Sequence, residues 1–318
     1  MSMLSRLDAI GKLIGKTPIF KLEKMTPSNT ASIYLKLEYT NPGGSHKDRI
    51  AYYMLKEAIE KGKLKEGSYV IEVSSGNTAL SLAWICRRLE LKTVFIVEYE
   101  ISPAKIAILK LLNSKILRVK SNFEKEDARI LKAKELEKKL GGLFINQFSN
   151  EANFRAHYET TAKEIVEQLK NKIDAFVMGI GTGGTIAGVS KYLKEKIGKK
   201  VLTIGVVPKG SSIIHEKAKS NERIEGLAKD IVPEIFMKYK NYIDKIVEVR
   251  EKDAIDTVKK LAVKEGLFVG PSTGANVFEA LKIAKELGPD KNVVTIAADS
   301  LFRYPQLLFQ FKNLRKDN

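Results

Sequence analysis

The sequence lacks the residues that mark several classes of protein. Its single cysteine, Cys86, excludes an internal disulfide framework and suits a reducing cytoplasm. No apolar run reaches the ~20 residues that a membrane-spanning helix needs. The first ten residues carry only Arg6 as a basic residue and no long apolar stretch, which argues against a secretory signal. We therefore expect a cytoplasmic protein that does not enter membranes.

Histidine is scarce as well. The three histidines, His46, His157 and His215, are too scattered to suggest a metal site, and we expect none. His46 precedes Lys47 directly, and in an extended segment its side chain would point away from that lysine.

Acidic residues are outnumbered, which gives the chain a net charge of +17. The basic residues are nevertheless interleaved with acids, as in residues 132–139, which is the pattern of a solvated helix face. No compact basic block alternates with aromatic residues, as a groove for single-stranded nucleic acid would require. We expect no nucleic-acid partner.

What the chain does contain is an alternation of β-branched runs with amphipathic segments over 318 residues, enough for two packed domains. Several runs are apolar almost throughout, as are strands buried on both faces of a parallel sheet. The pattern predicts an open α/β architecture, whose active sites gather at the carboxyl ends of strands. The strand-like segments are residues 33–37, 70–73, 93–97, 115–119, 175–180, 201–207, 245–249, 267–269 and 293–297.

One loop that follows a strand ends in a lysine. Residues 41–46 form a turn rich in Gly and Pro, and Lys47 stands where a helix is predicted to begin near Asp48. Partial desolvation and the positive end of a helix dipole both lower the pKa of an amine and favour the neutral form that attacks a carbonyl. An ordinary surface lysine remains the alternative from these residues alone.

The loop at residues 74–78 combines hydroxyls, a glycine and an amide at a predicted helix start. Such a loop can receive a small anion such as a carboxylate. A capping sequence that only satisfies the helix amides explains it equally well.

Residues 179–185 are rich in glycine and lie between an apolar strand and a helix, which favours a phosphate site. The stretch also fits the G-x-G-x-x-G pattern of dinucleotide-binding proteins. Against that alternative, the next strand carries no acid for a ribose hydroxyl, although Lys209 leaves an NADP phosphate open. A fourth loop, residues 270–275, reads by itself as a helix cap around Ser272.

In their order along the chain, these loops resemble the fold type II pyridoxal-phosphate enzymes and, within them, the cysteine synthase group. The resemblance implies an α/β fold of two open, mostly parallel twisted sheets flanked by helices, like the tryptophan synthase β-subunit. It runs from residues 14–18 to residues 303–304. The motifs that carry it are Asn41-Pro42, Gly44-Ser45, Lys47-Asp48-Arg49, Ser75-Gly76-Asn77-Thr78, Gln147-Phe148, Asn150, Ala152-Asn153, His157, Thr160-Thr161 and Gly181 to Thr185.

The resemblance also implies roles for individual residues. Lys47 would hold pyridoxal 5′-phosphate as a Schiff base and then move the Cα proton. It further implies a larger cofactor-binding domain of residues 1–40 and 151–318, a smaller mobile substrate-binding domain of residues 41–150, and a homodimer. The cofactor would be bound by Lys47, Asn77, Gly181, Thr182, Gly183, Gly184, Thr185 and Ser272, and the substrate by Ser74, Ser75, Thr78, Gln147 and Gly226.

The reaction implied is a β-replacement. An activated serine, O-acetylserine or O-phosphoserine, would lose its leaving group to give an α-aminoacrylate, and sulfide would add to give L-cysteine. Ser272 would face the pyridine nitrogen as a neutral hydroxyl, which makes the ring a weaker electron sink and suits elimination. A cystathionine β-synthase-like enzyme or a serine/threonine dehydratase with the same cofactor stays open, as does a non-catalytic relative.

Departures from the family pattern bear on the substrate. The chain has Ser74 for a Thr, Ala79 for a Gly, and Glu98 in place of the Pro of a Met-Pro pair. Lys229 stands in a loop that resembles the leaving-group side of the site. We expect Lys229 to favour an anionic leaving group such as phosphate, with a solvent-facing lysine as the alternative.

Overall fold

The computed structural model describes residues 2–99, 101–120, 127–198 and 200–311, and in it the chain divides into two compact units. The smaller unit comprises residues 1–15 and 41–157, and the larger comprises residues 16–40 and 158–318. No helix in the described ranges is long and apolar enough to cross a membrane.

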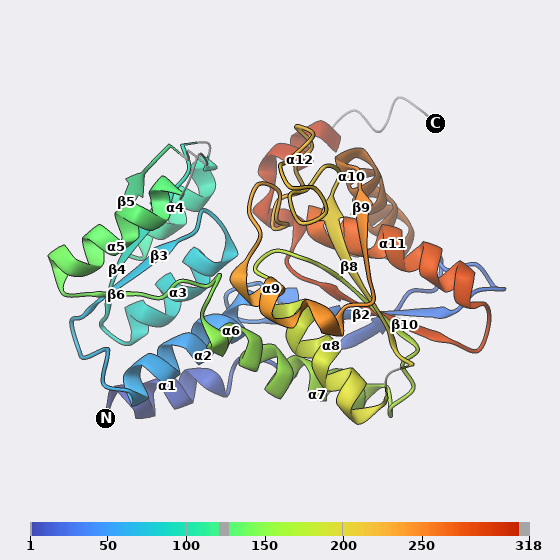
Figure 1. Ribbon diagram of the computed structural model, residues 1–318, viewed down its shortest axis with the longest axis horizontal. Coiled ribbons are helices and arrows are strands. Elements are labelled where there is room, and N and C mark those ends of the chain that lie inside the picture. Colours follow the sequence, from blue (N-terminus) through green and yellow to red (C-terminus); the bar gives the residue numbers. More distant parts are fainter. Residues whose placement is uncertain (1, 100, 121–126, 199, 312–318) are drawn as a thin grey trace. The chain divides into compact units, whose positions relative to one another are not determined.

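The smaller unit is built on a four-stranded parallel sheet with the order β5-β4-β3-β6 (Figure 1). Its strands are β3 (Tyr69–Val73), β4 (Lys92–Val97), β5 (Lys115–Arg118) and β6 (Leu143–Phe144). Its helices are α1 (Met3–Gly11), α2 (Lys47–Glu60), α3 (Asn77–Arg88), α4 (Pro103–Leu111), α5 (Ala128–Leu140) and α6 (Glu151–Ala156).

This sheet is covered on both faces, because alternate residues of a strand point to opposite sides. Phe95 of β4 packs in the cluster formed with α1, α2 and α3, whereas Ile96 packs in the cluster that includes Ala133 and Leu136 of α5. The continuous apolar run of residues 94–97 in β4 therefore follows from burial on two sides.

The larger unit contains a six-stranded sheet with the order β1-β2-β10-β7-β8-β9, parallel except for β1. Its strands are β1 (Ile19–Lys21), β2 (Ser32–Leu37), β7 (Ala175–Gly179), β8 (Leu202–Pro208), β9 (Lys245–Val249) and β10 (Asn292–Ala297). Its helices are α7 (Ala162–Gln168), α8 (Gly184–Lys196), α9 (Glu234–Tyr239), α10 (Glu251–Lys260), α11 (Pro271–Leu287) and α12 (Pro305–Gln310).

The two open, mostly parallel sheets flanked by helices confirm the predicted fold class. One segment was predicted wrongly. Residues 267–269 form no strand, and only Val269 makes an isolated antiparallel bridge, to Ser300. Three residues before a helix are too few to show whether a neighbouring strand is in reach.

The structure also assigns residues 1–15 and 151–157 differently from the expected division, which placed both with the larger domain. Leu7 and Ile10 of α1 are buried in the same apolar cluster as Ile50 and Met54 of α2. Residues 1–15 therefore belong with residues 41–157.

Candidate functional site

Lys47 is the first residue of α2, and the turn before it is hydrogen-bonded to the side chain of the next residue, Asp48. The buried carboxylate of Asp48 accepts hydrogen bonds from Ser81 Oγ at 2.6 Å, from Trp84 Nε1 at 3.0 Å and from the backbone N–H of Gly43. A Cβ at Gly43 would lie 2.2 Å from this carboxylate, so only glycine fits there. The turn that presents Lys47 is thus fixed by an acid in the first turn of the helix.

His46 differs from the extended conformation considered from the sequence. Its φ of −60° and ψ of −16° are helical. Its ring lies 5.8 Å from the ring of His157, centroid to centroid, and both side chains are buried. The sequence separation of more than 100 residues hid this contact.

Residues 74–78 follow β3 and lead into α3, as predicted. Ser74 Oγ accepts hydrogen bonds from the backbone N–H groups of Gly76 at 3.2 Å and Ala79 at 3.3 Å, so this serine caps the start of the helix. Ser75 Oγ accepts one from Glu98 N at 3.0 Å, which ties the loop to the end of β4. The capping function is present for these two amides, and the position of the loop at a helix N-terminus is one that favours an anion.

Gln147 lies beside this loop. The hydroxyl of Thr78 donates a hydrogen bond to Gln147 Oε1 at 2.6 Å, and Gln147 Nε2 donates one to Val73 O at 3.3 Å. Both side chains are buried. The structure therefore brings together two residues that the sequence places 69 positions apart.

Glu72 is a buried acid that the sequence interpretation did not single out. Its carboxylate accepts hydrogen bonds from Val73 N at 2.8 Å and Gln147 N at 3.2 Å. Burial raises the pKa of this carboxyl to about 8, and the two N–H donors act in the opposite direction without overcoming it. The available signal was a lone acid within the apolar run of residues 69–73.

Glu72 gives the stability of the protein a predictable pH dependence. The folded state keeps this proton to about pH 8, whereas the carboxyl of the unfolded chain loses it near the ordinary glutamate pKa of 4.5. Between these values the unfolded state binds fewer protons, so the free energy of unfolding falls as pH rises, by at most about 1.4 kcal/mol per unit.

The measurement is urea unfolding of the wild type and of Glu72→Gln from pH 5 to pH 8. The stability of the wild type relative to the variant should decline across this range, because glutamine does not titrate. A difference that stays constant with pH would contradict the assignment.

In the larger unit, residues 181–185 join the end of β7 to the start of α8. Gly183 has a φ of +86°, and a Cβ on it would lie 2.8 Å from Phe236 Cβ and N. A Cβ at Gly181 would lie 2.5 Å from Gly226 O. Glycine is therefore required at both positions, and the loop lies at the N-terminus of a 13-residue helix, a place where backbone amides can bind a phosphate.

Gly226 and Ser272 lie close to this loop. A Cβ on Gly226, which has a φ of +92°, would be 3.7 Å from Ser272 Oγ, and Ala228 N donates a hydrogen bond to Ile180 O at 2.7 Å. Ser272 is the second residue of α11 and is buried. Two segments predicted to contact the cofactor, residues 181–185 and Ser272, thus lie close to Gly226, predicted to contact the substrate, within the larger unit.

Lys229 is not the solvent-facing lysine considered as an alternative. It is only 5% exposed, and its ammonium donates hydrogen bonds to Lys209 O at 2.7 Å and Ser220 Oγ at 2.9 Å. Desolvation lowers its pKa. The side chain therefore closes the loop between residues 209 and 229, a role that the sequence did not reveal.

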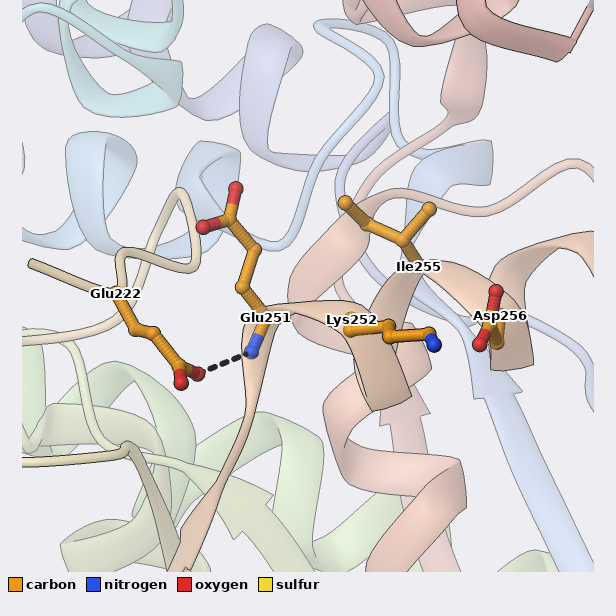
Figure 2. Close-up of a pocket in the computed structure, with 5 residues that line it drawn as sticks. All are labelled: Glu222, Glu251, Lys252, Ile255 and Asp256. Carbon is orange, nitrogen blue, oxygen red and sulfur yellow. Dashed lines mark hydrogen bonds between the residues drawn. The ribbon is translucent and has the colours of Figure 1, made fainter.

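A cavity of about 390 Å³ in the larger unit lies elsewhere (Figure 2). It contains none of the predicted site residues, and Glu222 accepts a hydrogen bond there from Glu251 N at 2.8 Å. Its acidic lining does not suit a phosphate or a carboxylate. The residues lining it are Glu222, Glu251, Lys252, Ile255 and Asp256.

Comparisons with known proteins show the family of the chain. Residues 10–299 match the model of the pyridoxal-phosphate dependent enzyme family. A probable cysteine synthase of Bacillus subtilis is 38% identical over 307 residues, covering 95% of this chain and 97% of that protein.

Two solved structures are similar over nearly the whole chain. O-ureido-L-serine synthase superposes with a TM-score of 0.89 at 32% identity, covering 97% of this chain and 96% of the other. An O-acetylserine dependent cystathionine beta-synthase from Helicobacter pylori gives 0.85 at 35% identity, covering 96% and 97%.

Proposed function

The chain belongs to the pyridoxal-phosphate-dependent enzymes, among relatives of the cysteine synthase and cystathionine β-synthase type, and we propose that it makes L-cysteine from an activated serine and sulfide. The activated serine is O-acetylserine or O-phosphoserine. The loop of residues 181–185 supports this proposal, because it requires glycine at positions 181 and 183 and lies at the N-terminus of α8, where backbone amides can bind a phosphate group.

We propose that residues 181–185 hold the cofactor phosphate through backbone amides and the hydroxyls of Thr182 and Thr185. Lys47 would hold the cofactor covalently, and Asn77 would donate a hydrogen bond to its ring hydroxyl. The bound cofactor withdraws electrons from the substrate Cα, which eases departure of the Cα proton and of the β leaving group.

The remaining steps fall to the protein. The amides at the start of α3, with the hydroxyls of Ser74, Ser75 and Thr78 and the amide of Gln147, would bind and orient the substrate carboxylate. The amine of Lys47 would take the Cα proton as a general base.

The buried hydroxyl of Ser272 would favour reaction at Cβ over transamination. Ser272 lies at the start of α11 beside Gly226, and we propose that it faces the ring nitrogen of the cofactor. A hydroxyl does not enforce a positive charge on that nitrogen as a carboxylate does, and this favours elimination and replacement at Cβ over transamination.

The proposal is tested with the purified protein saturated with pyridoxal phosphate. O-acetylserine, O-phosphoserine and serine are supplied in turn, each with sulfide or with homocysteine, and the amino-acid product is identified by mass spectrometry. We expect L-cysteine from at least one activated serine. Product from homocysteine alone would indicate a cystathionine synthase, and pyruvate without a nucleophile a dehydratase.

A substitution at Lys229 tests preference for the leaving group. Two of its three N–H donors are used by Lys209 O and Ser220 Oγ, and we propose that the third faces an anionic leaving group. Lys229→Met should lower kcat/KM for O-phosphoserine about 10-fold more than for O-acetylserine, in line with one lost charge-assisted hydrogen bond.

Damage to the loop itself affects both substrates, so the ratio of the two kcat/KM values isolates the effect on the leaving group. Ser220→Ala removes one acceptor of the ammonium and serves as the control for loop damage. An unchanged ratio in Lys229→Met would contradict the role of Lys229.

A further inference from the structure

We propose that Glu72 is a positioning residue that sets the backbone of Gln147 and, through its side chain, the hydroxyl of Thr78 for binding the substrate carboxylate. This inference rests on the proposed function, since it concerns the residues that we propose to bind the substrate carboxylate, namely residues 74–78 and Gln147 (the carboxylate loop). Glu72 itself touches neither substrate nor cofactor in this account.

The argument begins with the sheet of the smaller unit. Strands β3 and β6 pair in parallel through Val70 with Leu143 and Ile71 with Phe144, and Ile145 N still donates to Ile71 O at 3.0 Å. Two residues beyond each member of this last pair the pattern changes. The N–H groups of Val73 on β3 and of Gln147 after β6 both donate to the carboxyl group of Glu72 instead.

The carboxyl group of Glu72 therefore bridges the two chain segments at the point where β3 and β6 separate. One oxygen takes the N–H of Val73 at 2.8 Å and the other takes that of Gln147 at 3.2 Å. A buried N–H group without a partner costs about 1–3 kcal/mol, so Glu72 stabilises the separation of the strands.

The separation leaves room for the side chain of Gln147. It folds back to donate to Val73 O at 3.3 Å and accepts from Thr78 Oγ1 at 2.6 Å. The carbonyl of Gln147 accepts from Asn153 Nδ2 at 2.8 Å, which holds the peptide from its other side. Glu72 is thus hydrogen-bonded directly to the backbone of Gln147 and, through the side chain of Gln147, is connected to Thr78.

Two acceptor oxygens are essential to this bridge, and the neutral carboxyl group of Glu72 supplies both, because its protonated oxygen keeps a lone pair that accepts. A glutamine in place of Glu72 keeps the size of the side chain but has one acceptor and an NH₂ group, so one backbone N–H must face a donor. The variant Glu72→Gln therefore removes one arm of the bridge with little change in volume.

The test compares Glu72→Gln with Thr93→Val. Thr93 lies on β4 of the same sheet, is buried, and donates a hydrogen bond to Ser114 Oγ at 2.8 Å. Its loss costs a buried hydrogen bond without touching the carboxylate loop. Both proteins are used as holoenzymes, and the dissociation constant of L-alanine, which has no leaving group, is measured from the cofactor absorbance.

We expect Glu72→Gln to raise the dissociation constant of L-alanine about 10-fold, to speed hydrogen exchange at the Gln147 amide and to leave cofactor affinity unchanged. Thr93→Val should lower the melting temperature and leave the dissociation constant of L-alanine as in the wild type. Where Glu72→Gln does not fold, Glu72→Asp serves, because its shorter side chain keeps two acceptors but cannot reach both amides.

The inference would be overturned if Glu72→Gln had the wild-type dissociation constant for L-alanine. It would also be overturned if Thr93→Val raised that constant as much as Glu72→Gln does. Failure of the proposed function looks different, because the protein would then form no cysteine from any activated serine whatever the effect of Glu72→Gln on L-alanine.

Discussion

Replacing Lys47 with arginine is expected to lower kcat by about 10²- to 10⁴-fold, the usual contribution of a positioned general base. Arginine keeps the positive charge at the start of α2, but its guanidinium does not deprotonate in a protein and cannot attack an aldehyde. Borohydride reduction followed by peptide mass spectrometry should find a pyridoxyl group on Lys47 of the wild type and none at residue 47 of the variant.

Lys56→Arg is the matched control. Lys56 lies on the same helix and pairs with Asp8 at the surface, with 3.5 Å between Nζ and Oδ1. This variant should keep both the activity and the attachment at Lys47. An active Lys47→Arg enzyme, or a pyridoxyl group found on another lysine of the wild type, would refute the role of Lys47.

Replacing Gly183 with alanine is expected to weaken binding of pyridoxal phosphate by about 100-fold. The φ of +86° costs an L-residue with a side chain about 1–3 kcal/mol, and the added Cβ would lie 2.8 Å from Phe236 N and Cβ. The loop can relieve this contact only by moving the amides that we propose to face the phosphate. Fluorescence titration of the apoenzyme with the cofactor gives the dissociation constant.

Gly266→Ala is the control that distinguishes the effect of backbone strain alone from the effect of displacing the loop of residues 181–185. Gly266 has a comparable φ of +69°, and a Cβ there would meet no atom within 4 Å. This variant should lower the melting temperature without changing cofactor affinity. If Gly183→Ala and Gly266→Ala had the same dissociation constant for pyridoxal phosphate, residues 181–185 would not hold the phosphate.

The sequence by itself determined most of the strands, though not β1 or β6, and the loops that follow them. Apolar runs such as residues 93–97 and 293–297 became strands, because burial on both faces of a parallel sheet leaves a local signature. The glycines of residues 181–185 marked close backbone approaches, since a side chain there would collide with Gly226 or Phe236. Such features depend on neighbours in the chain and on residue size.

Only the tertiary structure decided which partners the buried polar groups find. Glu72 finds its partner 75 residues away in Gln147, and Lys229 finds one 20 residues away in Lys209. Residues 1–15 join the smaller unit because Leu7 and Ile10 reach an apolar cluster formed by distant segments. A hydrogen bond or an apolar contact between remote segments leaves no periodic pattern in the sequence. The loops were therefore predictable from the sequence, whereas the buried acid that we propose to position Gln147 became visible only in the folded chain.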